Sequence, residues 1–240
     1  MSNMFTTLGV GAGTAGTGPS SLTGLIIWLK ADSLGLNNND VIPTWSDQSG
    51  RGNHFTQSLG DALKPIYHTA QINGLPAVYI PFVSNNGIGL ASGYTDGTPT
   101  EGECFAVVKA DADPAADPGS GWLWDFSTVG FPDSFVDNSG HIFLAWGRST
   151  RTDVGDPAAS FAGWRRINIW SKTNDYSLQI DTVNFFATAT NTVSFNANPR
   201  FSKQATIYTG HIAEYIQYNR KLSAGERTQV DDYLKAKYAL

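Results

Sequence analysis

Residues 210–240, GHIAEYIQYNRKLSAGERTQVDDYLKAKYAL, constrain the fold of this chain more than any other stretch. Residues 210–218 begin at a glycine and are rich in Ile, Tyr and Ala, which predicts a strand. Ser223 and Glu226 form the pattern of a capping box, in which each side chain bonds the backbone N–H of the other residue at a helix start. The apolar residues that follow recur at helical spacing: Val230, Tyr233, Leu234 and Tyr238. Such a stripe faces a core, so the chain is predicted to end in a strand and a packed amphipathic helix.

The remainder of the sequence has the rhythm of a β protein. Short runs of apolar and β-branched residues are separated by Gly, Pro, Asn and Asp, which predicts strands near residues 25–30, 42–45, 53–56, 77–82, 88–91, 103–109, 122–126, 141–146, 164–170, 176–180, 183–188, 192–195 and 205–208. Many short strands and one terminal helix indicate an all-β fold of two packed antiparallel sheets. The length of 240 residues suits one large sandwich, and no domain boundary follows residue 21.

Both ends of this region resemble a known family. At the C-terminal end, the matching residues are Gly210, Ile212, Glu214, Tyr218, Asn219, Arg220, Leu222, Ser223 and Glu226. At the other end, LIIWLKADS at 25–33 and WSDQSGRGNHF at 45–55 are similar to an opening strand and an Asp-Ser-Gly turn. The chain thus resembles the laminin-G-like domains of the concanavalin A-like lectin/glucanase superfamily over residues 22–240. The resemblance implies a concanavalin A-like jelly roll with a face that binds glycans.

Charge and composition exclude several classes of partner. The net charge of −5 argues against nucleic acid and anionic membranes as partners. No stretch is long and apolar enough to insert in a bilayer. The single cysteine, Cys104, cannot form an internal disulfide, and its place in an apolar strand favours a buried thiol. The N-terminus lacks the pattern of a secretory signal, so we expect synthesis and folding in a cytoplasm.

Residues 1–21 are predicted to form a flexible arm, because Gly, Ala, Thr and Ser dominate them. Their sizeable apolar side chains are Met4, Phe5, Leu8 and Val10. Burial of these four in a groove of a neighbouring subunit would offset the entropy of ordering the arm. We therefore expect the arm to hold neighbouring subunits together. This predicts a homo-oligomer and a role in a virion.

Catalytic patterns are weak. Glucanases of the superfamily place three carboxylates at alternate strand positions, whereas only Glu101 and Glu103 alternate here, without a third carboxylate at Phe105 or Val107. We interpret the pair as a solvated strand entry. Glu214 matches a position that non-catalytic laminin-G-like relatives also carry. The histidines lack metal-ligand spacing and are expected at the surface or at strand ends: His54, His68, His141 and His211.

Calcium is the metal that the resemblance implies, held at the rim of the sandwich by oxygen ligands. The candidate ligands are Asp47 with Asn53, or the loop residues Asp111, Asp113 and Asp117. Neither set has the fixed spacing of a dedicated calcium loop. Aspartates in turns more often bond their own backbone, and we favour that alternative.

The candidate glycan-binding surface lies on residues 164–170, WRRINIW. In a strand, Ile167 and Ile169 face one side, and the side chains on the other side are Trp164, Arg166, Asn168 and Trp170. Indoles beside planar hydrogen-bonding groups can stack on a sugar and read its hydroxyls. Trp122 and Trp124 alternate in the same way and could extend the surface. The alternative is that some of these tryptophans line the space between the sheets, and we favour it for Trp122 and Trp164. The predicted glycan-binding residues are therefore Trp124, Arg166, Asn168 and Trp170.

Taken together, these observations predict a non-enzymatic structural and binding module. We expect a virion protein, such as a capsid decoration or tail component, with a lectin-like body anchored by its N-terminal arm. Two alternatives remain open at this point: a glycoside hydrolase or lyase that acts on polysaccharide, and a free lectin. A fold alone does not decide among them.

Overall fold

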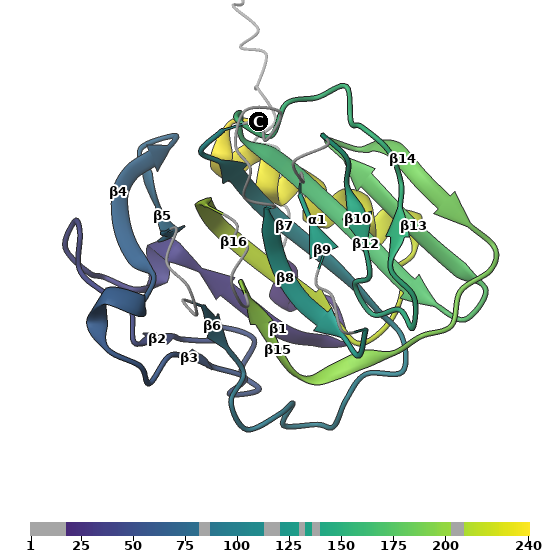
Figure 1. Ribbon diagram of the computed structural model, residues 1–240, viewed down its shortest axis with the longest axis horizontal. Helices are drawn as coiled ribbons and strands as arrows, with labels where there is room; N and C mark the ends of the chain where they lie inside the picture. Colours follow the sequence, from purple (N-terminus) through teal and green to yellow (C-terminus); the bar gives the residue numbers. More distant parts are fainter. Residues whose placement is uncertain (1–17, 82–86, 113–120, 130–132, 136–139, 203–208) are drawn as a thin grey trace, which may run out of the picture.

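The computed structural model describes residues 18–81, 87–112, 121–129, 133–135, 140–202 and 209–240. Over these residues the chain is a sandwich of two eight-stranded antiparallel sheets with one α-helix (Figure 1). This confirms the predicted all-β fold. Short 3₁₀ turns lie at Pro19–Ser21, Ala31–Ser33 and Asp61–Leu63.

The back sheet, farther from the viewer in Figure 1, follows the order β14-β13-β12-β7-β16-β5-β4, and β1 also pairs with β16. Its strands are β1 (Leu25–Lys30), β4 (Ile66–Ile72), β5 (Leu75–Ile80), β7 (Gly102–Ala110), β12 (Arg165–Lys172), β13 (Asp175–Ile180), β14 (Val183–Thr188) and β16 (Gly210–Tyr218).

The front sheet follows the order β11-β10-β9-β8-β15-β6-β3-β2. Its strands are shorter: β2 (Thr44–Trp45), β3 (Phe55–Thr56), β6 (Ile88–Gly89), β8 (Trp122–Ser127), β9 (Asp133–Ser134), β10 (Phe143–Leu144), β11 (Thr152–Asp153) and β15 (Phe195–Phe201).

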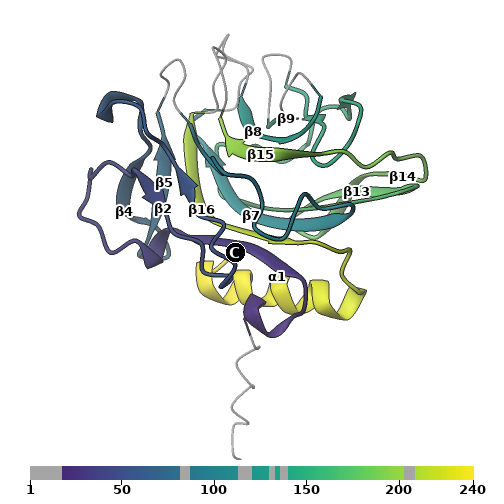
Figure 2. The same cartoon turned by 90° about the horizontal axis from the view of Figure 1, so that it is seen from below.

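Three layers follow from this arrangement, and Figure 2 shows them edge-on as helix, back sheet and front sheet. The main core fills the space between the sheets, where Trp124, Phe126 and Tyr215 are fully buried and in ring contact. A second apolar cluster lies between the back sheet and the helix. The helix-facing surface of the back sheet is therefore largely covered.

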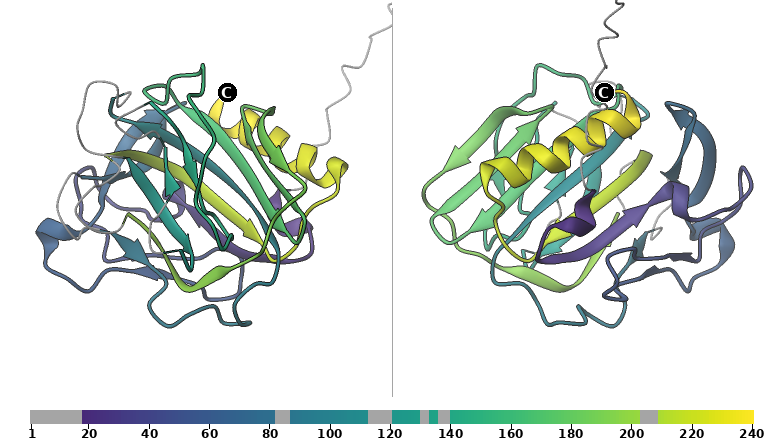
Figure 3. Two further views of the ribbon diagram at one scale, coloured as in Figure 1. Left: turned by 45° about the vertical axis from the view of Figure 1, so that its right-hand side comes forward. Right: turned by 180° about the vertical axis from the view of Figure 1, so that it is seen from behind.

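The helix α1 (Ala224–Tyr238) crosses the back sheet from outside (Figure 3). Its predicted capping box is confirmed, because Ser223 Oγ accepts from the Glu226 N–H and the Glu226 carboxylate accepts from the Ser223 N–H. Of the predicted apolar stripe, Val230, Leu234 and Tyr238 are buried against the sheet. Among the described residues, no helix has the length and apolar character needed to span a membrane.

Strand boundaries differ from the prediction in a few places. The strands at 25–30, 183–188 and 210–218 match β1, β14 and β16 as predicted. The strand expected at 192–195 lies instead at Phe195–Phe201, and β4, β9 and β11 were not predicted. The strand expected at 205–208 falls outside the described residues.

The end of the predicted arm contacts the sandwich. Tyr218 Oη donates to the Pro19 carbonyl at 3.0 Å, and Gln229 Nε2 donates to Ser21 Oγ at 2.7 Å. Residues 18–21 thus pack beside α1. The four assembly residues Met4, Phe5, Leu8 and Val10 lie outside the described residues, so their role stays a prediction.

Candidate functional site

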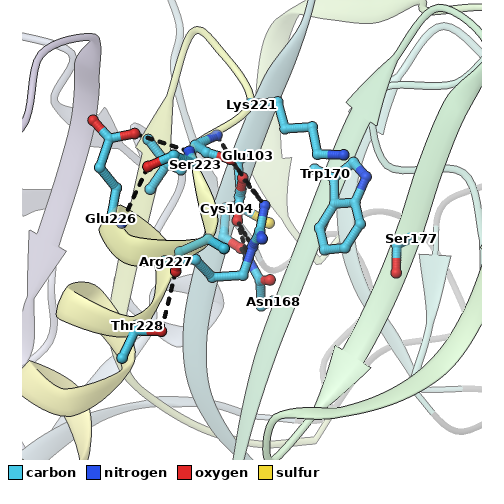
Figure 4. Close-up of polar contacts among 12 residues, drawn as sticks. Glu103, Cys104, Asn168, Trp170, Ser177, Lys221, Ser223, Glu226, Arg227 and Thr228 are labelled. Atoms are coloured by element: carbon cyan, nitrogen blue, oxygen red, sulfur yellow. Dashed lines mark hydrogen bonds and ion pairs between the residues drawn. The ribbon is translucent and has the colours of Figure 1, made fainter.

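The predicted alternation along β12 is confirmed. Ile167 and Ile169 belong to the core between the sheets, whereas Arg166, Asn168 and Trp170 lie on the opposite side of the strand, which α1 covers. Figure 4 shows that this side of β12 meets the start of the helix. Three of the four predicted glycan-binding residues therefore share one face.

A buried carboxylate organises this face. Glu103, on β7, has a fully buried side chain, and Arg227 of α1 donates to both of its oxygens, at 2.7 and 3.0 Å (Figure 4). Leu222 N donates to Glu103 at 2.8 Å, and Asn168 Nδ2 donates to it at 2.9 Å. The interpretation of Glu103 as a solvated strand entry was wrong. A charged group buried with this many donors holds the helix to the sheet.

Arg166 and Trp170 take part in the same helix–sheet contact. Arg166 Nε donates to Asp231 of α1 at 2.8 Å, in a pair that is almost fully buried. The Trp170 ring lies against two cations, Arg227 at 4.2 Å and Lys221 at 4.5 Å from its centroid. These side chains are engaged by the helix and its preceding turn. Glycan binding by Arg166, Asn168 and Trp170 stays a prediction.

Trp124 does not share this surface, which corrects the expected arrangement. Its side chain is fully buried between the sheets, 5.3 Å from the Phe135 ring and 5.8 Å from the Tyr215 ring. The alternation of Trp122 and Trp124 belongs to β8 in the front sheet, so it could not extend a surface on β12 in the back sheet.

The calcium candidates near the first turn are committed to backbone bonds. The Asp47 carboxylate accepts from four donors: Trp28 N, Ser49 N, Ser49 Oγ and Asn53 N. The Asn53 side chain donates to the Ile26 carbonyl and accepts from Thr95. This is the turn arrangement that we favoured.

The second calcium set is only partly described. Asp111 accepts from Tyr79 Oη at 2.9 Å, whereas Asp113 and Asp117 lie outside the described residues. Where the structure does describe the chain, no three His, Cys, Asp or Glu side chains are placed together as a metal site requires. Calcium binding was the less favoured interpretation, and the residues outside the described ranges leave it untested.

Two of the histidines meet, which sequence spacing did not indicate. His68 Nδ1 lies 3.0 Å from His211 Nε2, although the residues are 143 positions apart. The order β16-β5-β4 brings them together, and the His68 ring stacks on Tyr79 of the intervening strand at 4.8 Å. Burial lowers the pKa of His211 to about 4 and also lowers the pKa of His68, so both rings are neutral at pH 7.

A long groove lies on the front sheet, on the side away from α1. Its main part has a volume of about 680 Å³ and runs over β3, β6 and β15. A second hollow of about 470 Å³ continues it, since both are lined by Thr56, Leu90 and Ala91. By comparison, the hollow between α1 and β12 has a volume of about 330 Å³. Among these, the groove on the front sheet has room for an extended ligand.

The groove carries side chains that the fold does not use. Arg200 and Asn198 are exposed on β15, and in the described parts of the chain their side chains make no hydrogen bond or ion pair. Leu59 lines the groove with 46% of its surface exposed, an unusual value for a large apolar residue of this chain. Apolar surface beside free planar hydrogen-bonding groups is the chemistry that recognises a sugar, whose rings have apolar and hydroxylated faces.

Gly89 shapes the floor of the groove. It pairs with Arg200 across β6 and β15, and a Cβ on Gly89 would lie 2.6 Å from Arg200 Cβ and 2.8 Å from the Pro199 carbonyl oxygen. Any larger residue would push the two strands apart. Glycine therefore permits the close approach that aligns Arg200 with the groove.

One strand that lines the groove, β15, was predicted only at its start, at 192–195. In FNANPRF the buried residues are Phe195, Pro199 and Phe201, and the exposed Ala197 interrupts the alternation expected of a strand. A proline inside a run normally demotes a strand, since it cannot donate to the ladder. Here β15 carries a register irregularity between Phe195 and Arg200, which accommodates Pro199.

Comparison with known proteins supports the fold. No protein-family model matches this sequence, and no curated protein is significantly similar to it. Among solved structures, the binding domain of Paraclostridial Mosquitocidal Protein 1 aligns with a TM-score of 0.62 and 12% identity, over 90% of this chain and 52% of that one. Domain 4 of AbnA, a GH43 extracellular arabinanase from Geobacillus stearothermophilus, in complex with arabinotriose, aligns with a TM-score of 0.55 and 16% identity, over 87% of this chain and 97% of that one.

Trypanosoma rangeli sialidase in complex with sialic acid is also similar, with a TM-score of 0.57 and 15% identity over 90% of this chain. This chain spans 33% of the length of the sialidase. At these identities the likeness shows the fold, a lectin-like sandwich consistent with the concanavalin A-like expectation.

The comparisons correct one expectation. The prediction of a non-enzymatic protein is contradicted, because this fold is similar to a part of a sialidase and to one domain of a GH43 arabinanase, which are enzymes. None of the three similar proteins is a virion protein, and the virion role stays a prediction.

Proposed function

We propose that this chain is a glycan-binding β-sandwich of the kind found in carbohydrate-degrading proteins, and that the groove over β3, β6 and β15 holds the glycan. The observation that carries this proposal is the groove itself, which has room for an oligosaccharide and presents uncommitted polar side chains beside the exposed Leu59. The similar arabinanase domain, which was solved with arabinotriose, adds support from fold analogy. The finer assignment to laminin-G-like domains rests on the terminal sequence motifs.

Two groove variants test the site. Asn198→Ala and Leu59→Ala are each expected to weaken binding of an oligosaccharide, chosen from an immobilised panel that includes arabinotriose, by about tenfold, since each removes one contact worth roughly 1.4 kcal/mol. Both residues are exposed, so the thermal unfolding midpoint should not change. The matched control is Asp232→Ala, in the hollow beside α1. If only the control variant loses affinity, the glycan binds beside the helix and the groove assignment is wrong.

A second candidate function is hydrolysis of the bound glycan. Asp125 of β8 pairs with Arg200 across neighbouring strands and is the candidate carboxylate; its side chain is buried, so hydrolysis would require it to become exposed to the glycan. Glycoside hydrolases use carboxylates as acid, base or nucleophile. For a hydrolase, we expect the parent protein to release reducing sugar from the oligosaccharide that it binds, and Asp125→Asn to abolish the release while affinity is kept. A parent protein that binds the oligosaccharide without releasing sugar contradicts hydrolysis and leaves binding intact.

A further inference from the structure

We propose that the groove selects acidic glycans, those that carry carboxylate groups, and that Arg200 is the residue that selects them. This inference rests on the proposed glycan-binding function and adds the chemical class of the ligand. Two observations support it: the guanidinium of Arg200 has no partner among the described residues, and the residues that line the groove include no aspartate or glutamate.

Arg200 presents a guanidinium group at the surface of the groove. Its side chain is exposed in the groove, and throughout the described residues it has neither an ion-pair partner nor a hydrogen bond. Two arginines at the contact between α1 and the back sheet differ from Arg200 in this respect: Arg166 pairs with Asp231, and Arg227 pairs with Glu103. An unpaired guanidinium presents a planar fork of donors that matches a carboxylate with two parallel hydrogen bonds.

The lining of the groove contains no acidic side chain. Among the residues that line its two hollows, Arg200 carries the only formal charge, and there is no aspartate or glutamate. His54, in the second hollow, accepts the Asp47 N–H at its Nδ1, so that nitrogen carries no proton. The lining therefore contributes one positive and no negative formal charge, which favours an anionic ligand over a cationic one.

The carboxylate on the paired strand does not cancel this charge. Asp125 lies across from Arg200 on β8, but its side chain is buried and no ion pair joins the two residues. Arg200 pairs with Gly89 on β6, and glycine has no side chain. The residue opposite Arg200 on β6 therefore does not block a ligand from reaching the arginine side chain. The guanidinium is therefore free to meet a ligand carboxylate.

The test uses one ligand in two charge states. Tetragalacturonate and its methyl ester differ in the charge of their carboxyl groups, and binding of both is measured with the parent protein, Arg200→Gln and Arg200→Lys. We expect the parent to bind the acid about ten- to a hundredfold more tightly than the ester, the range of one charged hydrogen-bond pair. Arg200→Gln should abolish that preference, and Arg200→Lys should keep part of it. Added salt should weaken binding of the acid only.

The outcomes separate this inference from the proposed function. Equal affinity of the parent for acid and ester, or an unchanged preference in Arg200→Gln, overturns selection of acidic glycans while groove binding stands. A parent protein that binds neither form overturns the inference, and binding of neutral oligosaccharides then decides the proposed function separately. A matched control, Lys172→Gln, removes one exposed cation from the back sheet and should leave the preference unchanged.

Discussion

Glu103→Ala is expected to lower the free energy of unfolding by about 3–5 kcal/mol, because it leaves a largely buried arginine and two further donors, Leu222 N and Asn168 Nδ2, without their shared acceptor. Arg227 and Leu222 donate to this carboxylate from α1 and the turn before it, and Asn168 donates from β12. The loss is a large fraction of the ~5–15 kcal/mol that stabilises an ordinary domain. Urea unfolding followed by tryptophan fluorescence measures it.

Glu101→Ala is the matched control, since it removes the same side chain two residues earlier. Glu101 is partly exposed and lies 3.6 Å from Lys172, an arrangement worth about 0–1 kcal/mol at a surface. Glu103→Gln is a milder variant that keeps the shape of the side chain and should fall between the two. Equal losses in the two alanine variants would show that Glu103 does not anchor the helix.

The opposite end of α1 is attached to the sheet in the same way. Glu214, fully buried on β16, accepts from Trp28 Nε1, Lys237 Nζ and Tyr238 Oη. Buried carboxylates therefore hold both ends of the helix, and the apolar stripe fills the space between them. This explains why the C-terminal motif was the most informative stretch of the sequence: it contains the strand, the helix and Glu214.

What could be predicted from sequence depended on local interactions. The capping box joins Ser223 to Glu226 within one helical turn, and alternation along β12 follows from the strand itself, so both were predictable. The partner of Glu103 was not predictable, because Arg227 is 124 positions away. Carboxylates without a partner are seldom buried. Because the sequence showed no partner for Glu103, we expected its side chain to be exposed to solvent.

The groove escaped prediction for the same reason. Thr56, Gly89 and Arg200 come from β3, β6 and β15, three strands far apart in the chain that meet only in the front sheet. None of these three residues lies in a sequence motif that indicates a binding site. Sheet order, which sequence patterns do not reveal, decides which of these residues become neighbours.

The stability of the protein is also expected to depend on pH through Asp133. This carboxyl group is fully buried, and burial raises its pKa from the ordinary 3.8 to about 7, with Asp125 adding to the effect. The backbone N–H groups of Ala145 and Trp146 donate to Oδ1 and oppose the increase, as does the charge of Arg151. Oδ2 has no hydrogen-bond partner among the described residues, so burial of the charged form is only partly compensated.

The direction of the pH dependence follows from the raised pKa. Below about pH 4 both the folded and the unfolded protein carry a protonated Asp133, so the group has no effect. Between about pH 4 and pH 7 the folded protein keeps the proton that the unfolded chain releases, and stability falls as pH rises. Above pH 7 the full cost is present, roughly 4 kcal/mol for the interval from 3.8 to about 7 at ~1.4 kcal/mol per pH unit.

Asp133→Asn isolates this effect, because the amide keeps an oxygen that can accept from Ala145 and Trp146 but cannot ionise. The free energy of unfolding of the variant minus that of the parent is expected to increase by about 4 kcal/mol between pH 4 and pH 8. Any destabilisation by the amide that does not depend on pH cancels in this comparison. Asp153→Asn is the control: hydrogen bonds from His141 and from the Gly155 N–H lower the pKa of Asp153 below its ordinary 3.8, so its effect on stability changes only below about pH 4, and the difference between this variant and the parent should stay constant between pH 4 and pH 8. Urea unfolding at each pH gives both comparisons, and parallel profiles for the parent and Asp133→Asn would show that the buried carboxyl group is not the source of the pH dependence.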